Sequence, residues 1–256
     1  YTGKSKGFLG RPAGAIQDLM LKNNIGLVCY RSCNDKGLDN IFIANTLIDL
    51  HLVGSGSNIF PLYRNKDIFD ADMNYDKLEN FTQDFREFMD SKYSEHFSPE
   101  AILGYIYAVL FHKDYREKYI DFLKIDFPKI PFVESKEKFI ALSKLGQNLI
   151  ATHLMQENNI ESIGEALFLD TANKSLAIDK PNYKEREQRL FINKSLYFDK
   201  VSKEVWEYEI GGYAVLDKYL KSHKGEEIDY EYFQQIVQAL HKSLEIESRI
   251  GAIKLN

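Results

Sequence analysis

Cysteine, proline and tryptophan are scarce in this sequence of 256 residues, which holds two, six and one of them respectively. The two cysteines, Cys29 and Cys33, are too few for a disulfide framework. A structural zinc usually takes four ligands, and the nearest histidine, His51, stands alone. We therefore expect no metal site, and a reduced, cytoplasmic protein with two incidental thiols.

Long apolar runs are absent as well. The longest, Ile102 to Phe111, is far shorter than the roughly 20 residues that a membrane-spanning helix needs, so we expect no membrane partner. Hydrophobic residues make up 44% and charged residues 28%, a balance typical of globular proteins. The chain opens with Tyr1-Thr2-Gly3-Lys4, without an initiator Met, which predicts a piece of a longer protein.

Motifs of catalysis are missing too. Gly54-Ser55-Gly56 lacks the Lys and the helix of a phosphate-binding loop. The base-holding loop of an adenine methyltransferase requires two adjacent prolines, and this sequence has no such pair. Glu134-Ser135-Lys136 lacks the upstream Pro-Asp of a metal-dependent nuclease. The residues from His112 to Arg116 could form an acid–base cluster, but a packed helix end explains them better. We expect no catalytic residue in this chain.

Charge is negative overall and unevenly distributed. The formal net charge is −5, yet residues 1–66 carry eight Lys/Arg against four Asp/Glu. Residues 67–100 carry three against ten, and residues 180–200 carry six against three. Two basic regions therefore flank an acidic one, a distribution that permits nucleic-acid contact on one face.

Hydrophobic periodicity predicts both strands and helices. Short β-branched runs predict strands in the N-terminal quarter, and Arg189 to Phe198 is typical of a β-hairpin with its turn at residues 193–195. Ser98, Ser135 and Asp229 are typical N-caps of helices. The predicted strands are 25–30, 41–44, 46–53, 59–63 and 206–210, and the predicted helices begin at residue 76 and cover 101–119, 136–153, 213–223 and the segment after 229.

These elements mix without regular alternation of strand and helix, which favours the α+β class. We expect a β-rich lobe over residues 1–95 packed on a helical lobe over residues 96–256. The second lobe is predicted to contain a hairpin region over 186–210 and the C-terminal helix. The prolines of the segment 126–132 exclude a helix there and predict a rigid crossing between the lobes.

Several motifs, in order along residues 1–224, are similar to those of one family. They are Tyr1 to Pro12, Phe60-Pro61-Leu62-Tyr63, Tyr105 to His112 with Tyr115-Arg116 and Tyr119, Phe122 to Pro131, Trp206, Ile210-Gly211-Gly212-Tyr213, and Lys218-Tyr219-Leu220-Lys221. Together they resemble the C-terminal target recognition (specificity) domain of type ISP enzymes, the helicase-bearing single-chain restriction–modification enzymes. Lys129 stands where Arg is common in that family, and Tyr219 where Trp is common.

The resemblance implies a two-lobed domain that recognises a sequence in double-stranded DNA. It would position the site for adenine N6 methylation by an upstream methyltransferase domain absent from this chain. The implied partners are DNA and the methyltransferase, helicase and nuclease domains of the parent, a DNA adenine methyltransferase or restriction endonuclease. No cofactor is implied for this chain; S-adenosylmethionine, with Mg²⁺ and ATP as further candidates, would serve the parent. The alternative is an interaction module that docks on the methyltransferase or helicase without reading bases.

Three groups of residues are candidates for DNA contact, because Arg and Lys suit phosphates and guanine and Asn suits adenine. For the second and third groups, a solvated turn and an exposed charged strand are equally acceptable explanations. The groups are the basic N-terminus (Lys4, Lys6, Arg11), the loop after the first strand (Arg31, Asn34, Lys36), and the hairpin region (Lys184, Arg186, Arg189, Asn193, Lys194).

Overall fold

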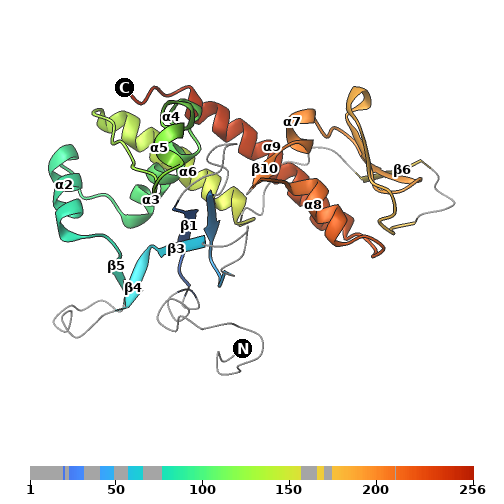
Figure 1. Ribbon diagram of the computed structural model, residues 1–256, viewed down its shortest axis with the longest axis horizontal. Helices are drawn as coiled ribbons and strands as arrows, with labels where there is room; N and C mark the ends of the chain where they lie inside the picture. The colour runs from blue at the N-terminus through green and yellow to red at the C-terminus, as the bar shows by residue number, and fades with distance from the viewer. Residues whose placement is uncertain are drawn as a thin grey trace.

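The computed structural model describes residues 20, 23–31, 41–48, 57–65, 77–156, 166–169, 175–210 and 212–256. Two lobes, each with its own apolar core, share one long C-terminal helix (Figure 1). The combination of helices with small antiparallel sheets confirms the predicted α+β class. None of the helices in this described part combines the length and apolar character that a membrane span requires.

A three-stranded antiparallel sheet opens the first lobe. Strand β1 (Gly26–Tyr30) lies between β2 (Ile41–Ala44) and β3 (Ser57–Pro61), with Val28 opposite Phe42 on one side and Ile59 on the other. β3 ends at Pro61 on the edge of the sheet, as its missing N–H predicts. Of the predicted strand 46–53, residues 46–48 are not in a strand and the remainder lies outside the described residues.

A short strand pair follows, and its second strand lies where the sequence predicted a helix. β4 (Tyr63–Asn65) pairs with β5 (Lys77–Glu79), so Leu78 of β5 lies opposite Arg64 of β4. Helix α2 (Gln83–Tyr93) begins only after its N-cap Thr82. The helical stripe predicted from residue 76 was therefore wrong at its start, because pairing with a distant strand fixes Leu78.

The central helix of the first lobe is broken where the sequence predicted continuity. Helix α3 (Pro99–Leu110) ends at Phe111, and α4 (Lys113–Lys118) begins at the N-cap His112, whose Nδ1 accepts the Asp114 N–H at 3.1 Å. The other ring nitrogen of this buried histidine lies 2.9 Å from the carbonyl oxygen of Ile253. The one-turn helix α5 (Ile120–Leu123) follows, and α6 (Lys136–His153) begins at Ser135 as predicted.

The proline-containing segment 126–132 lies within the first lobe, so the predicted crossing between lobes was wrong. The Tyr115 hydroxyl donates to the Lys129 carbonyl at 3.0 Å, and the Tyr105 hydroxyl donates to the Pro131 carbonyl at 2.7 Å. Phe127 also meets Phe60 of β3 edge to face, with ring centroids 5.5 Å apart. These contacts hold the segment against the first core.

The second lobe is built around a four-stranded sheet of order β6-β9-β8-β7. The strands of this sheet are β6 (Ala166–Phe168), β7 (Asn182–Lys184), β8 (Arg189–Phe191) and β9 (Leu196–Phe198). The 3₁₀ turn η2 (Glu185–Glu187) links β7 to β8, and strands β8 and β9 form the predicted hairpin.

Three short elements and a long helix complete this lobe. Helix α7 (Lys203–Trp206), capped by Ser202, takes only Trp206 of the strand predicted over 206–210. β10 (Glu209–Ile210) pairs with β11 (Tyr213–Ala214), which takes the first two residues of the predicted helix and leaves α8 (Val215–Ser222). Helix α9 (Tyr230–Gly251) begins at Asp229 as predicted.

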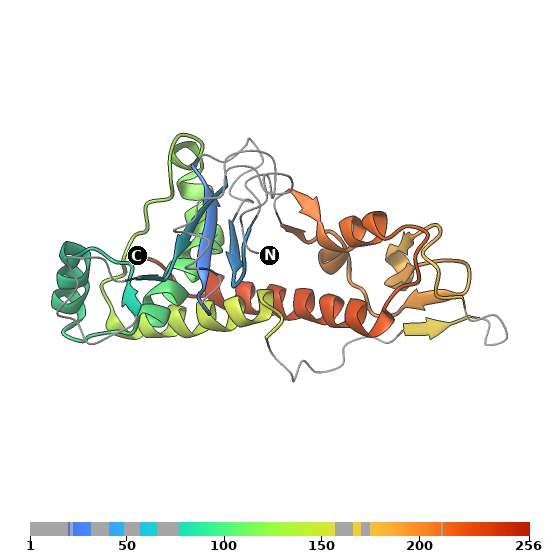
Figure 2. The same cartoon turned by 90° about the horizontal axis from the view of Figure 1, so that it is seen from below.

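The cores show how the lobes are divided. Met89 and Tyr93 of α2 share the first core with Ile102 of α3, so the proposed boundary after residue 95 falls inside that core. The second core groups residues between Ile178 and Leu240. Helix α9 enters both cores, and Figure 2 shows α6 (yellow) and α9 (red) in one row with both lobes rising on the same side of it.

Helices α3 and α6 cross so closely that their backbones touch. A Cβ placed on Gly146 would lie 1.8 Å from the carbonyl oxygen of Gly104, and one placed on Gly104 would lie 2.5 Å from the carbonyl oxygen of Ser143. No side chain can relieve such a clash, because the atoms in the way belong to the backbone. The crossing therefore requires glycine at both positions.

Replacing Gly146 with Ala should lower the free energy of unfolding by at least about 3 kcal/mol, because α3 and α6 must move apart. The matched control is Gly251→Ala at the end of α9, where an added Cβ meets nothing within 4 Å. That change should be neutral or stabilise the protein by about 0.5–1 kcal/mol. Urea unfolding followed by circular dichroism measures both; equal stabilities of the two variants would contradict the close crossing.

Candidate nucleic-acid interface

The structure describes six of the eleven predicted DNA-contacting residues. Arg31 lies in the first lobe, and the hairpin region of the second lobe holds the other five. The remaining predicted contacts lie outside the described residues: Lys4, Lys6, Arg11, Asn34 and Lys36.

Arg31 follows β1 directly and is held by an ion pair. Its Nε donates to Oδ1 of Asp126 at 3.0 Å, and its side chain is 73% exposed. The Phe127 backbone N–H and the Arg31 guanidinium together lower the pKa of Asp126 below its usual value. Because solvent screens an exposed pair of this kind, the guanidinium can exchange Asp126 for a phosphate without a large loss.

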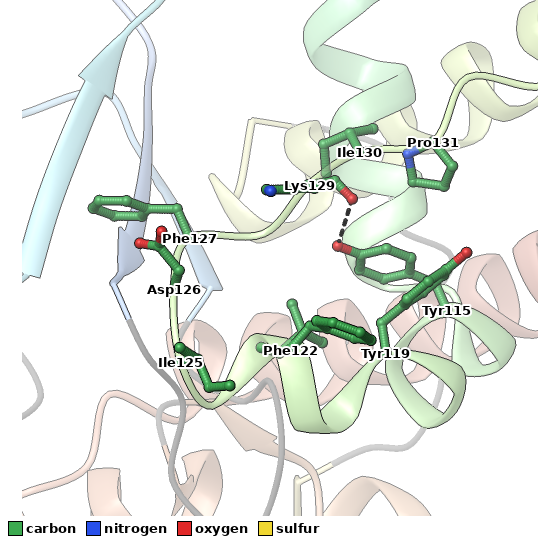
Figure 3. A pocket seen from close by; sticks show the side chains of 10 residues that line it. Tyr115, Tyr119, Phe122, Ile125, Asp126, Phe127, Lys129, Ile130 and Pro131 are labelled. Atoms are coloured by element: carbon green, nitrogen blue, oxygen red, sulfur yellow. Dashed lines mark hydrogen bonds between the residues drawn. The ribbon is translucent and has the colours of Figure 1, made fainter.

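A hollow of about 580 Å³ lies beside this ion pair, inside the loop that runs from α4 to Pro131 (Figure 3). Aromatic and aliphatic side chains form most of its wall, and Asp126 and Lys129 are its charged members. Two apolar side chains next to it face solvent, Phe122 (71% exposed) and Ile125 (75% exposed). The hollow can accept an apolar group.

Two of the hairpin cations are packed against the sheet. Lys184 Nζ lies 4.6 Å from the ring centroid of Phe191, and the Arg189 guanidinium lies 4.9 Å from that of Tyr197. The two rings stack on each other, with centroids 5.1 Å apart. Cation–π contact and ring stacking therefore join β7, β8 and β9 on one face.

Acidic neighbours neutralise the same two cations. Glu187 lies 3.4 Å from Lys184 Nζ and 3.3 Å from Arg189 Nη1, and Asp199 lies 3.4 Å from Arg189 Nε. Glu185 pairs with Lys203 at 3.4 Å. The three acidic residues of the segment 180–200 are thus engaged with Lys184, Arg189 and Lys203, and the segment keeps its excess of three positive charges.

Asn193 shapes the hairpin turn. Its Oδ1 accepts the backbone N–H groups of Ser195 and Leu196, both at 2.8 Å. Its Nδ2 donates to the carbonyls of Ser175 at 2.9 Å and Ala177 at 2.8 Å. Because its amide is fully hydrogen-bonded within the protein, reading an adenine would require breaking the turn, which disfavours the predicted contact.

Arg186 and Lys194 are the remaining hairpin candidates. Both are exposed, and neither forms an ion pair with a described residue. Arg186 lies in the 3₁₀ turn η2, and Lys194 lies at the tip of the β8–β9 turn. These two side chains can meet a phosphate or a base edge without first losing an ion pair with any residue that the structure describes.

Arg31 follows β1 of the first lobe, and β1 (blue) and the second lobe (orange) lie on the same side of the α6–α9 row (Figure 2). This arrangement is compatible with contact of both groups with one duplex, and a common DNA-facing wall stays a prediction. Sequence reasoning gave no role to Phe122 and Ile125. A signal was present, because two large apolar residues three positions apart stand among the charged residues Asp121, Lys124 and Asp126.

One family model matches nearly the whole chain. The model of the Type ISP C-terminal specificity domain matches residues 1–247, which confirms the resemblance. No curated protein matches the chain significantly.

Three solved structures share the fold. They are the cryoEM structure of a DrdV–DNA complex (TM-score 0.70, 21% identity, 91% of this chain and 25% of that chain), the ATP-dependent Type ISP restriction–modification enzyme LlaBIII bound to DNA (0.64, 20%, 90% and 16%), and a nuclease-deletion mutant of the Type ISP enzyme LlaGI in complex with a DNA substrate mimic (0.63, 18%, 92% and 22%). The chain thus spans a quarter or less of the length of each of these proteins.

Removing both unpaired hairpin cations, as Arg186→Ala with Lys194→Ala, should weaken binding to duplex DNA by about tenfold. If both contact phosphates, the slope of log K against log salt should also fall by about 1.8. The control with the same net charge is Lys113→Ala with Arg249→Ala, two exposed cations on helices of the first lobe. Fluorescence anisotropy measures both; equal losses in the two double variants would assign the effect to net charge alone.

Proposed function

Because the chain belongs to the family of Type ISP C-terminal specificity domains, we propose that it recognises a specific sequence in double-stranded DNA. The observation that carries this proposal is the family match, which runs through nearly the whole chain. The solved proteins of the same fold support it, since all three are described as bound to DNA or to a DNA substrate mimic.

Recognition of this kind needs two sorts of contact. Phosphate contacts fix the register of the protein on the duplex, and base-edge contacts choose the sequence. Arg31, with its exposed and exchangeable ion pair, suits a phosphate. Arg186 and Lys194 suit either role because no described acidic side chain holds them. Lys184 and Arg189 serve chiefly to stiffen the sheet that presents them.

The chain contributes no catalytic residue to the reaction in this proposal. A methyltransferase domain upstream in the parent protein rotates the target adenine out of the helix, at a cost of a few kcal/mol, and transfers the methyl group of S-adenosylmethionine. By holding the duplex beside that domain, the specificity domain makes the rotation directional. Mg²⁺ and ATP are needed in addition if the parent also translocates on and cleaves DNA.

Selection from a pool of randomised duplexes tests the proposed reading of sequence. The 256-residue chain should enrich a short common sequence, and its affinity for that sequence should fall steeply with salt. A scrambled duplex of the same length and composition is the control. Equal affinity for the enriched and scrambled duplexes would leave only non-specific binding and would contradict sequence recognition.

A second candidate function is docking on another domain of the parent, and the hollow beside Phe122 favours it. Exposed apolar patches of this kind commonly mark protein–protein contacts. The loop that carries Phe122 and Ile125 is anchored after them, because the hydroxyls of Tyr115 and Tyr105 donate to the carbonyls of residues 129 and 131, and such anchoring reduces the cost of ordering the loop against a partner.

Replacing Phe122 with Ser should separate the two candidate functions. If the hollow meets another domain, hydrogen exchange of residues 119–130 should be slower in the parent than in the 256-residue chain, and Phe122→Ser should abolish the difference. Duplex affinity of the isolated chain should then be unchanged. Leu169→Ser, at another exposed apolar residue in the second lobe, is the control. A loss of duplex affinity in Phe122→Ser alone would instead place this loop against DNA.

A further inference from the structure

Tyr208 connects the two lobes through its hydroxyl group. Its ring belongs to the second core and is 8% exposed. Its hydroxyl is hydrogen-bonded to Glu247, in the part of α9 that belongs to the first lobe, and lies 3.4 Å from Nε2 of His153, the last residue of α6. A side chain of the second core thus ends among polar groups of the first lobe.

The hydrogen-bonded chain continues into the first core. Nδ1 of His153 lies 2.7 Å from the hydroxyl of Tyr107, a fully buried residue of α3. Tyr107, His153, Tyr208 and Glu247 therefore form one connected chain, which we call the interlobe chain. Four separate segments contribute to it: α3, α6, the turn between α7 and β10, and α9.

A single order of protons satisfies the whole interlobe chain. The Tyr107 hydroxyl donates to Nδ1 of His153, Nε2–H donates to the Tyr208 oxygen, and the Tyr208 hydroxyl donates to the Glu247 carboxylate. This order needs a neutral imidazole. Burial, reinforced by the positive charge of Arg116, lowers the pKa of His153 to about 4, so the ring is neutral at pH 7.

The interlobe chain lies near a serine of α9 whose hydroxyl bonds back to the helix itself. Ser243 is buried between Leu240, the last fully buried α9 residue of the second core, and Ile246 of the first core, and its neighbour Leu244 still packs against the second core. The Ser243 hydroxyl donates to the carbonyl of Ala239 at 2.8 Å, four residues back. Back-bonding of this kind bends helices and slightly destabilises them.

Tyr208 lies on one side of this point and Glu247 on the other. A bend of α9 at Ser243 would change the angle between the lobes, and it would also pull the Tyr208 hydroxyl away from Glu247 and His153. Loss of those bonds would leave buried polar groups unsatisfied, which is costly in the protein interior. The interlobe chain therefore resists the motion that α9 alone would allow.

We propose that Tyr208, His153 and Glu247 are positioning residues that fix the angle between the two lobes, and so set the spacing at which both lobes meet a DNA duplex. The fixed angle between the lobes is inferred from the geometry of the interlobe chain. Its effect on DNA spacing rests on the proposed function.

The test compares Tyr208→Phe with Tyr183→Phe in the 256-residue chain. Both changes remove one hydroxyl and keep the ring, but the Tyr183 hydroxyl donates within the second lobe, to the Val201 carbonyl at 3.0 Å. Spin labels at Lys144→Cys in α6 and Glu204→Cys in α7, with Cys29 and Cys33 replaced by Ser, report the distance between the lobes by double electron–electron resonance. Tyr208→Phe should at least double the width of the distance distribution, and Tyr183→Phe should leave it unchanged.

A change at Glu247 tests the same idea independently of Tyr208. Glu247→Gln keeps an acceptor for the Tyr208 hydroxyl and should keep the narrow distribution, whereas Glu247→Leu should broaden it. A narrow distribution in both Tyr208→Phe and Glu247→Leu would overturn the proposal.

Duplex affinity, measured on the unlabelled variants, tests whether the fixed angle sets the spacing on DNA. Tyr208→Phe should weaken binding about tenfold, with Tyr183→Phe unaffected. A broad distribution with unchanged affinity would support the fixed angle and overturn its role in DNA spacing. Failure of the unmodified chain to bind any duplex would overturn the proposed function, while the distance measurement would still test the fixed angle between the lobes.

Discussion

The contact between α3 and α6 is the constraint on which the rest of the molecule depends. Because Gly104 and Gly146 let the two backbones touch, α6 lies directly against the buried face of α3. Helix α9 packs on α6 in turn and then continues into the second core. The positions of both lobes therefore depend on one pair of glycines. If α3 and α6 moved apart there, α9 would move with α6 and shift the hairpin of the second lobe.

Local chemistry made part of this fold predictable. The N-caps Ser98, Ser135 and Asp229 each accept an N–H three residues ahead, so the information that starts these helices lies within one turn of sequence. The β8–β9 turn is local in the same way, because Asn193 accepts the backbone N–H groups of Ser195 and Leu196, two and three residues ahead. Long-range partners fixed what the sequence missed. Leu78 takes a strand conformation because of Arg64, and the break before His112 is stabilised by Ile253.

The candidate site was less predictable than the fold, because the availability of a cation depends on its surroundings. A count of Lys and Arg cannot distinguish Arg189, which lies over a ring between two carboxylates, from Lys194, which has no described partner. The same limit applies to the division into lobes. The return of α9 into the first core through Ile246 and Ile250 places the C-terminus with segments more than a hundred residues earlier.

The ion pairs of Lys184 and Arg189 have a consequence for selectivity. A domain with a large unpaired positive surface binds any duplex strongly, and its preference for one sequence is then a small part of the total affinity. Pairing Lys184 and Arg189 with carboxylates lowers that non-specific contribution while keeping the cations as rigid supports of the sheet. In the proposed function, fewer unpaired cations then provide the contacts, so their positions relative to the duplex matter more. The proposed fixed angle between the lobes and a sparse set of available cations would serve the same end.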